Sequence, residues 1–208
     1  MAPPPTTDVS PVIIRHAGRI EGFAIVSEDG MLATADRVMP PSLIFDADKH
    51  FFERGLDGVD VVVHGRHSHE QQEHSPQRRR LILTRRVAGL EQHSSNRLAL
   101  WWNPAGALLS KALAAIGVPD DASIGVIGGA DVFALFLDSF DVFHLSRAPN
   151  VRLPGGRPVF PDVPERTPEQ VLANHGLVPG QVEALDAAQC VTLVSWRRAQ
   201  NFDRLRGA

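Results

Sequence analysis

A short apolar segment that runs into two successive glycines, within residues 124–136, constrains the fold more than any other feature. Residues 124–127 have the apolar density of a buried strand, Gly128 and Gly129 follow, and from Ala130 apolar residues recur at helical spacing. Because glycines allow close approach, backbone N–H groups at the start of that helix can point at a phosphate. The alternative is that the glycine pair only permits a tight turn with close helix packing.

The composition indicates one soluble domain without a strong charge bias. A chain of 208 residues with 43% hydrophobic content is long enough to bury one sizeable core. The net charge of −3 supplies no positive field for nucleic acid or an anionic membrane, so neither partner is expected. The single cysteine, Cys190, favours a reducing, cytoplasmic location and is expected to be a buried residue of an apolar strand. No apolar run approaches the roughly 20 residues that a membrane-spanning helix needs.

Strands and helices alternate along the chain. The predicted strands are residues 20–27, 59–64, 81–84, 124–127 and 142–146, and the predicted helices are 46–54, 105–116 and short helices from Ala130 and Thr167. Gly55 and Gly58 are predicted to stop the helix at 46–54, and Asn103 with Pro104 to start the helix at 105–116. This alternation describes an α/β fold.

The two ends of the chain differ in composition. Residues 1–11 are rich in proline and are expected to form a disordered arm, which leaves residues 12–208 as a single domain. Residues 181–184 and 189–197 are predicted to pair as an antiparallel hairpin. Residues 31–43 have an irregular pattern and are expected to form a loop long enough to be functional.

A second strand-to-helix junction follows the predicted strand at 59–64. Gly65, Arg66, His67 and Ser68 come directly after that strand, and arginine, histidine and hydroxyl side chains all suit phosphate oxygens. In an α/β sheet such junctions lie at the carboxyl ends of the strands, where ligands bind. The two junctions together favour phosphate binding over a purely structural role for the glycine pair.

Four segments, in their order and spacing, resemble the dihydrofolate reductase superfamily, which includes the reductase domain of riboflavin biosynthesis. They are Ser27-Glu28-Asp29-Gly30, Asp48-Lys49-His50-Phe51-Phe52, Val61-Val62-Val63-His64-Gly65-Arg66-His67-Ser68-His69-Glu70 and Val126-Ile127-Gly128-Gly129-Ala130-Asp131-Val132-Phe133. The match covers roughly residues 20–161. The resemblance implies a mostly parallel central sheet flanked by helices, with NADPH across the carboxyl ends of its strands.

Two departures make the chain most similar to stand-alone relatives of the riboflavin-type reductases. Met39-Pro40-Pro41-Ser42 lacks the tryptophan that dihydrofolate reductases usually carry after the proline of their mobile loop. A chain with one cysteine cannot hold the zinc deaminase domain that is fused to many riboflavin enzymes. Arg78 is a candidate for holding a folate glutamate tail. The three successive arginines, Arg78, Arg79 and Arg80, are explained equally well as solvent-exposed residues at the start of the strand at 81–84.

The resemblance implies cofactor contacts residue by residue. Gly65, Arg66, His67 and Ser68 match the junction that binds cofactor phosphates. Thr84 and Arg85 match positions near the adenosine 2′-phosphate, where added positive charge favours NADPH over NADH. The segment under the cofactor pyrophosphate is matched by Ile127, Gly128, Gly129, Ala130, Asp131 and Val132.

Asp48 is the candidate catalytic residue. It matches the acid on the helix after the mobile loop, where a partly buried carboxylate holds a pyrimidine-like ring and assists its protonation during hydride transfer. The alternative is a solvated surface aspartate near a helix start.

The resemblance therefore implies an NADPH-dependent reductase acting on a small molecule with a pterin or pyrimidine-type ring, similar to a riboflavin precursor. The alternative is a non-catalytic nucleotide-binding module of the same fold. Four histidines lie within residues 64–74, but no acidic or cysteine ligands share a regular spacing with them, so no metal site is predicted. Relatives of the riboflavin type are often dimeric, so a homodimer is expected.

Overall fold

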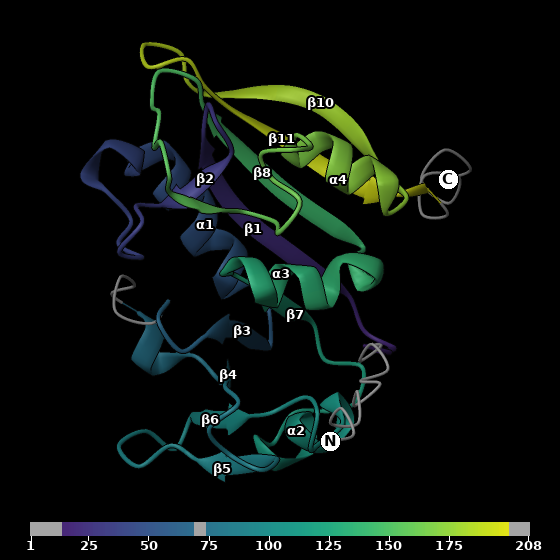
Figure 1. Cartoon of the computed structure of the whole chain (residues 1–208). Coiled ribbons are helices and arrows are strands. Elements are labelled where there is room, and N and C mark those ends of the chain that lie inside the picture. Colours follow the sequence, from purple (N-terminus) through teal and green to yellow (C-terminus); the bar gives the residue numbers. More distant parts are fainter. Residues whose placement is uncertain (1–13, 69–73, 200–208) are drawn as a thin grey trace, which may run out of the picture.

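A computed structural model of the chain describes residues 14–68 and 74–199 (Figure 1). The predicted arm at residues 1–11 lies outside these ranges. The described part forms one nine-stranded sheet in the order β10-β11-β8-β1-β7-β3-β4-β6-β5. Its strands are β1 (Ile20–Ser27), β3 (Val61–Gly65), β4 (Arg80–Leu83), β5 (Leu90–Gln92), β6 (Ala99–Trp102), β7 (Ile124–Val126), β8 (Val142–Ala148), β10 (Leu177–Asp186) and β11 (Val191–Arg198).

The centre of the sheet is parallel and both of its edges are antiparallel. Neighbouring strands from β8 through β1, β7, β3 and β4 to β6 run in the same direction. At one edge β5 pairs antiparallel with β6, and at the other the hairpin β10-β11 pairs antiparallel with β8. The predicted α/β fold, its mostly parallel sheet and the C-terminal hairpin are therefore confirmed.

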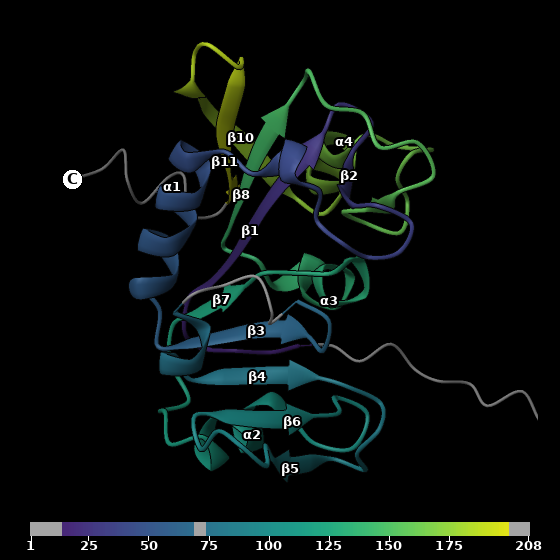
Figure 2. The same cartoon turned by 90° about the vertical axis from the view of Figure 1, so that its left-hand side faces the viewer.

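Helices cover both faces of the sheet. The helix α1 (Asp46–Asp57) lies on one face, and α2 (Leu109–Ala115), α3 (Ala130–Phe136) and α4 (Pro168–Asn174) pack on the other, as Figure 2 shows for α1 and α3. Short 3₁₀ helices occur at η1 (Pro41–Leu43), η3 (Ser75–Gln77) and η4 (Leu137–Ser139). A separate two-stranded sheet joins β2 (Met31–Ala33) to β9 (Arg157–Pro158).

Alternation along the strands sends apolar side chains to both faces of the sheet. Val26 belongs to the larger core, which also contains Phe133 of α3. Phe23 lies on the same strand, an odd number of positions before Val26, so its side chain points to the opposite face. There it packs with Leu56 and Val62 beneath α1. A sheet buried on both faces explains why its parallel strands are almost continuously apolar.

Two helices differ from their predicted bounds. α1 continues through Gly55 and ends at Asp57, with Gly58 as its C-cap. Gly55 allows close packing rather than stopping the helix, because a Cβ atom there would lie 2.4 Å from Phe23 Cε1. α2 begins at Leu109 rather than at residue 105. The Asn103 side chain instead accepts a hydrogen bond from the Ala105 N–H and donates one to the Val87 carbonyl, which holds a turn.

The remaining differences concern short strands and the cysteine. The expected loop at 31–43 contains β2 and η1, and β5, β6 and β9 have no predicted counterpart. These strands are only two to four residues long, too short to show a period. Cys190 is exposed, with φ of 58° in the turn between β10 and β11, and is not a buried strand residue.

Candidate active site

A cavity of about 1430 Å³ lies at the carboxyl ends of β3, β4 and β7 and continues between the sheet and α1. The residues given a cofactor-binding or catalytic role from the sequence all line it, although they come from four separate segments of the chain. They are Asp48, Gly65, Arg66, His67, Ser68, Thr84, Arg85, Ile127, Gly128, Gly129, Ala130, Asp131 and Val132. The lining holds six lysine and arginine side chains against three carboxylates, which favours an anionic ligand.

One side of this cavity, here called the strand-end wall, is formed by the segments after β3, β4 and β7. The Gly65 N–H donates to the Gly128 carbonyl at 2.8 Å, and the Ile127 N–H donates to the Val63 carbonyl at 3.0 Å. The Ser68 hydroxyl lies 3.5 Å from the same Gly128 oxygen. Backbone hydrogen bonds therefore fix the two predicted junctions against each other.

The turn before α3 depends on Gly128. Its φ is +104°, a conformation that residues with a side chain rarely adopt, and a Cβ atom there would lie 3.0 Å from a Phe133 ring carbon. Gly129 has an ordinary φ of −69°, and no atom lies within 4 Å of a Cβ atom built on it. The two glycines thus do different things, since the first allows the turn and the second leaves open space in the cavity.

Cationic and hydroxyl side chains complete the strand-end wall. Arg66 Nε donates to His67 Nε2 at 2.9 Å. Thr84 is buried, and its hydroxyl accepts a hydrogen bond from the Arg86 N–H at 3.1 Å, while the Arg85 and Arg86 side chains are exposed. This arrangement presents positive charge beside backbone that can approach a ligand closely.

The opposite side, here called the ring wall, includes the sheet face under α1. Asp48 lies in the first turn of α1. Burial raises the pKa of Asp48, and a hydrogen bond from Ser146 on β8 only partly opposes that rise. A fully solvated aspartate does not fit this environment. The carboxyl group of Asp48 therefore keeps its proton to a higher pH than an exposed aspartate does.

Aromatic rings lie beside Asp48 on the ring wall. His144 of β8 stacks on Phe23 with ring centroids 4.8 Å apart, and Phe51 of α1 meets His144 edge-on at 5.2 Å. Phe52 also lines the cavity. Together these rings form an apolar surface suited to a flat heterocycle.

His144 is held by polar partners from two other strands. Its Nε2 atom lies 2.9 Å from Glu21 Oε2, and its Nδ1 atom lies 2.9 Å from the Ser195 hydroxyl. Burial acts to raise the pKa of Glu21, but the hydrogen bond with His144 and the charge of Arg19, 2.9 Å away, lower it overall. Glu21 is thus a paired carboxylate, whereas no ion pair joins a cation to Asp48 in the described ranges.

Several residues of the ring wall were not identified from the sequence. His144 and Ser146 alternate with apolar residues along one strand, a pattern that places both side chains on one face. That alternation could have placed His144 and Ser146 side by side, but no feature of the neighbouring sequence connects either residue to Asp48. Arg37 and Arg157 also line the cavity and have no sequence signature of their own.

Arg78, the candidate for a folate tail, does not line the cavity. Its Nη2 atom lies 2.6 Å from Glu53 Oε2 and 2.6 Å from Asp57 Oδ1, both on α1. The guanidinium is therefore engaged in fastening α1 to the start of β4.

Two other features are absent from the described ranges. No helix there combines the length and apolarity needed to cross a bilayer. Within residues 14–68 and 74–199, no three or more histidine, cysteine, aspartate or glutamate side chains are grouped so that they could share a metal ion.

Comparison with known proteins gives matches in structure only. No protein-family model and no curated sequence matches the chain. A solved diaminohydroxyphosphoribosylaminopyrimidine deaminase/5-amino-6-(5-phosphoribosylamino)uracil reductase from Thermotoga maritima is 16% identical with a TM-score of 0.56, over 88% of this chain and 57% of that one. This chain thus spans little more than half of that bifunctional protein.

Two other solved structures match over nearly their whole length. A protein from Shewanella sp. PV-4, named for riboflavin biosynthesis, is 17% identical with a TM-score of 0.52, over 86% of this chain and 98% of that one. Dihydrofolate reductase from Enterococcus faecalis, in complex with NADP(H) and RAB-propyl, is 17% identical with a TM-score of 0.51, over 88% of this chain and 98% of that one. The resemblance stated from the sequence is confirmed at the level of the fold, and this chain has the dihydrofolate reductase-like fold.

Proposed function

We propose that this protein is an NADPH-dependent reductase that transfers a hydride to a pyrimidine-type or pterin ring. The observation that carries the proposal is that one cavity joins the strand-end wall to a partly buried acid, Asp48, beside aromatic rings. A site of this kind has room for a dinucleotide and for a second, flat molecule. Two of the three solved structures reported above are named as reductases, and one of these is complexed with NADP(H).

The residues of the strand-end wall fit a dinucleotide phosphate. The space at Gly129 would be filled by a side chain, and a Cβ atom built there meets no atom within 4 Å. Arg66, Arg85 and Arg86 bring positive charge to the same wall, with Arg85 and Arg86 next to Thr84 at the end of β4. Two exposed arginines beside one hydroxyl suit the 2′-phosphate that distinguishes NADPH from NADH.

The cofactor, when bound, supplies the hydride that reduces a C=N or C=O carbon of the substrate. Asp48 holds the substrate ring by hydrogen bonds and gives a proton to its nitrogen or oxygen. This leaves Asp48 as a carboxylate, which the hydrogen bond from Ser146 stabilises until a proton returns from solvent. Phe23, Phe51 and His144 exclude water from one side of the ring and fix its orientation.

The pairing of Arg78 removes the sequence-based reason to expect a folate. Arg78 was the candidate cation for a folate glutamate tail, but it is already paired with Glu53 and Asp57. A phosphorylated ribosylaminopyrimidine has no such tail. A cytoplasmic homodimer belongs to the same proposal.

The test is cofactor binding followed by turnover. We expect the purified protein to quench NADPH fluorescence and to melt at a higher temperature with NADPH, with a weaker response to NADH. We then expect NADPH to be oxidised with a ribosylaminopyrimidine phosphate and more slowly with dihydrofolate. Absence of both quenching and stabilisation at millimolar NADPH contradicts the proposal. Binding of NADPH without oxidation by any pterin or pyrimidine supports instead a non-catalytic nucleotide-binding module.

A further inference from the structure

His144 lines the cavity, yet both of its ring nitrogens contact residues that do not. Nε2 lies 2.9 Å from Glu21 Oε2 and Nδ1 lies 2.9 Å from the Ser195 hydroxyl, and neither partner lines the cavity. The lowered pKa of Glu21 keeps it ionised at neutral pH, and an ionised carboxylate only accepts, so Nε2–H donates a hydrogen bond to Glu21. With both nitrogens engaged, the imidazole offers a bound molecule only its ring carbons and does not act as the proton donor.

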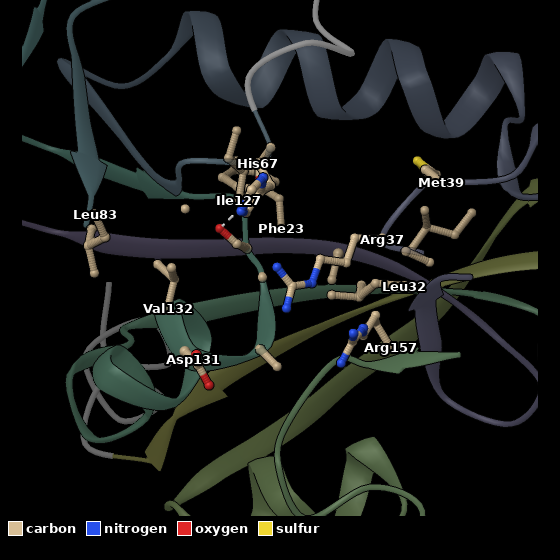
Figure 3. Close-up of a pocket in the computed structure, with 18 of the residues that line it drawn as sticks. Phe23, Leu32, Arg37, Met39, His67, Leu83, Ile127, Asp131, Val132 and Arg157 are labelled. Atoms are coloured by element: carbon tan, nitrogen blue, oxygen red, sulfur yellow. Dashed lines mark hydrogen bonds between the residues drawn. The ribbon is translucent and has the colours of Figure 1, made fainter. Parts of the chain in front are cut away.

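The register of the sheet explains how the imidazole is placed. The strands β1, β8 and β11 are neighbours, and Phe23, His144 and Ser195 are register partners across them. Their side chains therefore lie in one row on the face under α1. Glu21 lies two positions before Phe23 on β1 and points to the same face. Figure 3 shows Phe23, the ring on which His144 stacks, among the side chains that line the cavity.

Two pairs of contacts join α1 to β8. Asp48 has a hydrogen bond from Ser146, and Phe51 meets His144 edge-on with ring centroids 5.2 Å apart. Asp48 and Phe51 are three positions apart on the helix, so they share one of its faces. Likewise, His144 and Ser146 are two positions apart on the strand and share a face of the sheet. The contact between Phe51 and His144 is therefore an anchor of α1 within one turn of Asp48.

We infer that Glu21 is a positioning residue that acts on Asp48 through His144. The inference rests on the proposed function, in which Asp48 is the proton donor. A charge-assisted hydrogen bond is about twice as strong as a neutral one, so Glu21 holds the imidazole more firmly than the Ser195 hydroxyl does. When this hold is lost, Phe51 loses its support, the first turns of α1 move away from β8, and water reaches the Asp48 carboxyl group.

The titration of Asp48 tests the inference without cofactor or substrate. The aspartate carboxyl carbons are labelled for NMR, and Asp48→Asn identifies the signal of Asp48. Glu21→Met keeps most of the side-chain volume but has no oxygen, and we expect it to move the titration of Asp48 to lower pH, towards that of an exposed aspartate. Glu21→Gln removes the same charge but keeps an oxygen that accepts from His144 Nε2, so we expect it to leave the titration close to that of the wild type.

Asp138→Ala is the matched control. Asp138 pairs with His175 at 2.7 Å, and neither residue lines the cavity. This variant therefore removes a carboxylate from another histidine and should leave the titration of Asp48 unchanged. No variant alters the other charged side chains that described residues bring to the cavity outside the strand-end wall, which are Lys49, Glu53, Arg37 and Arg157.

Two results of the titration overturn the inference. One is an unchanged titration of Asp48 in Glu21→Met. The other is an equal fall in Glu21→Met and Glu21→Gln, since the lost charge alone would then explain it. If Glu21→Met does not fold, His144→Met, which removes the imidazole itself, takes its place with the same expectation.

Turnover gives a second readout. Because Glu21 does not line the cavity, Glu21→Met should lower kcat by about tenfold to a hundredfold and change KM less than about threefold. The alkaline limb of its pH–rate profile should move to lower pH, and Glu21→Gln should restore most of kcat. A rise in KM at unchanged kcat would assign Glu21 to ground-state binding and overturn the inference. If the wild-type protein binds no NADPH, the proposed function fails, and the titration of Asp48 still tests its positioning by Glu21.

Discussion

The two walls of the cavity are built in different ways. The strand-end wall is made of short continuous segments after β3, β4 and β7, and backbone groups form most of it. The ring wall is assembled from side chains far apart in the sequence, such as Phe23 of β1, Asp48 of α1 and His144 of β8. A continuous segment can be recognised by its own residues, whereas an assembled surface appears only once the sheet has formed.

The comparison extends to two partly buried carboxylates, Glu21 and Asp48, at the face of the sheet under α1. Glu21 is paired with His144 and Arg19, and its pKa is lowered despite burial. Asp48 has the hydroxyl of Ser146 as a partner but no cation within residues 14–68 and 74–199, and burial raises its pKa. The difference fits the proposed function, in which Glu21 would hold the His144 ring in place and Asp48 would exchange a proton.

The largest expected effect is that of Asp48→Asn, which tests this division directly. Loss of the acid should lower turnover by about 10²–10⁴-fold, the usual contribution of general acid catalysis. The folded-state pKa of Asp48 is raised, so its contribution to stability is present below the unfolded pKa and lost as pH rises through the folded pKa. Asparagine should therefore raise the melting temperature at neutral pH. The measurements are NADPH oxidation with an identified substrate and thermal melting.

Asp46→Asn is the matched control for that variant, because Asp46 lies in the same turn of α1 but is exposed and does not line the cavity. It should change neither turnover nor the melting temperature appreciably. Full turnover by Asp48→Asn would remove the catalytic role from Asp48.

The second effect concerns the strand-end wall. Gly129→Val should weaken NADPH binding by about tenfold to a hundredfold, because the side chain fills space that a charged, hydrogen-bonded phosphate would use. Its melting temperature should stay close to that of the wild type, since φ at Gly129 suits any residue. Fluorescence titration and thermal melting measure the two quantities.

Gly129→Ala and Gly128→Ala sharpen this test. The smaller side chain at 129 should give an intermediate loss of NADPH affinity. At Gly128 the positive φ and the nearby Phe133 ring should instead lower the melting temperature. Unchanged NADPH binding by Gly129→Val would place the cofactor elsewhere.

The third effect is a loss of stability in Glu21→Gln. Removing the charge that pairs with His144 and Arg19 should lower the free energy of unfolding by about 1–2 kcal/mol at neutral pH. Because the folded-state pKa of Glu21 is lowered, this contribution is present above the unfolded value of 4.5 and is lost as pH falls through the folded pKa. Urea denaturation at neutral and acidic pH should show that the difference in free energy of unfolding between the wild type and Glu21→Gln becomes smaller as pH falls.

The control for this variant is Glu183→Gln, which removes one negative charge from an exposed position on β10. An equal loss of stability in both variants would show that Glu21 acts only through net charge.

The smallest effect is expected for Ser146→Ala. The hydrogen bond from Ser146 lowers the pKa of Asp48, so its removal should raise that pKa further. If turnover requires protonated Asp48, the alkaline limb of the pH–rate profile should move to higher pH. Ser195→Ala is the control, because Ser195 contacts His144 rather than Asp48. A shift to lower pH would contradict the assignment of Asp48 as the proton donor.

Local patterns were sufficient for most of the fold. The apolar strands β1, β3, β7 and β8 and the glycine turn before α3 are continuous signals, as is the capping box of Thr167 and Gln170 at the start of α4. The strands β2, β5, β6 and β9 were missed because they are short and depend on partners elsewhere. Gly55 was wrongly predicted to end α1. The side chain that requires a glycine at this position belongs to Phe23, which lies on β1 and is distant in sequence.

The same distinction applies to the candidate site. Every residue given a cofactor-binding or catalytic role from the sequence lines the cavity, because each belongs to a segment that carries its own signal, whereas Arg78, whose register was ambiguous, does not. Ser146 and His144 needed knowledge of which strand lies beside α1. Arg37 and Arg157 needed the pairing of β2 with β9, which brings residues 122 positions apart into contact. Long-range pairing of this kind leaves no periodicity in either segment.

The absence of a side chain at Gly55 also bears on how acidic the site is. Gly55 lets α1 lie directly on the Phe23 ring, and the same helix carries Asp48 two turns earlier. The burial of the Asp48 carboxyl group is thus set by the contact between Gly55 and Phe23 at the other end of α1. Any side chain at position 55 would lift α1 from the sheet, admit water around Asp48 and return its acidity toward that of a surface aspartate. A residue with no functional group of its own thus sets the distance between α1 and the sheet, and with it the acidity of the proposed proton donor.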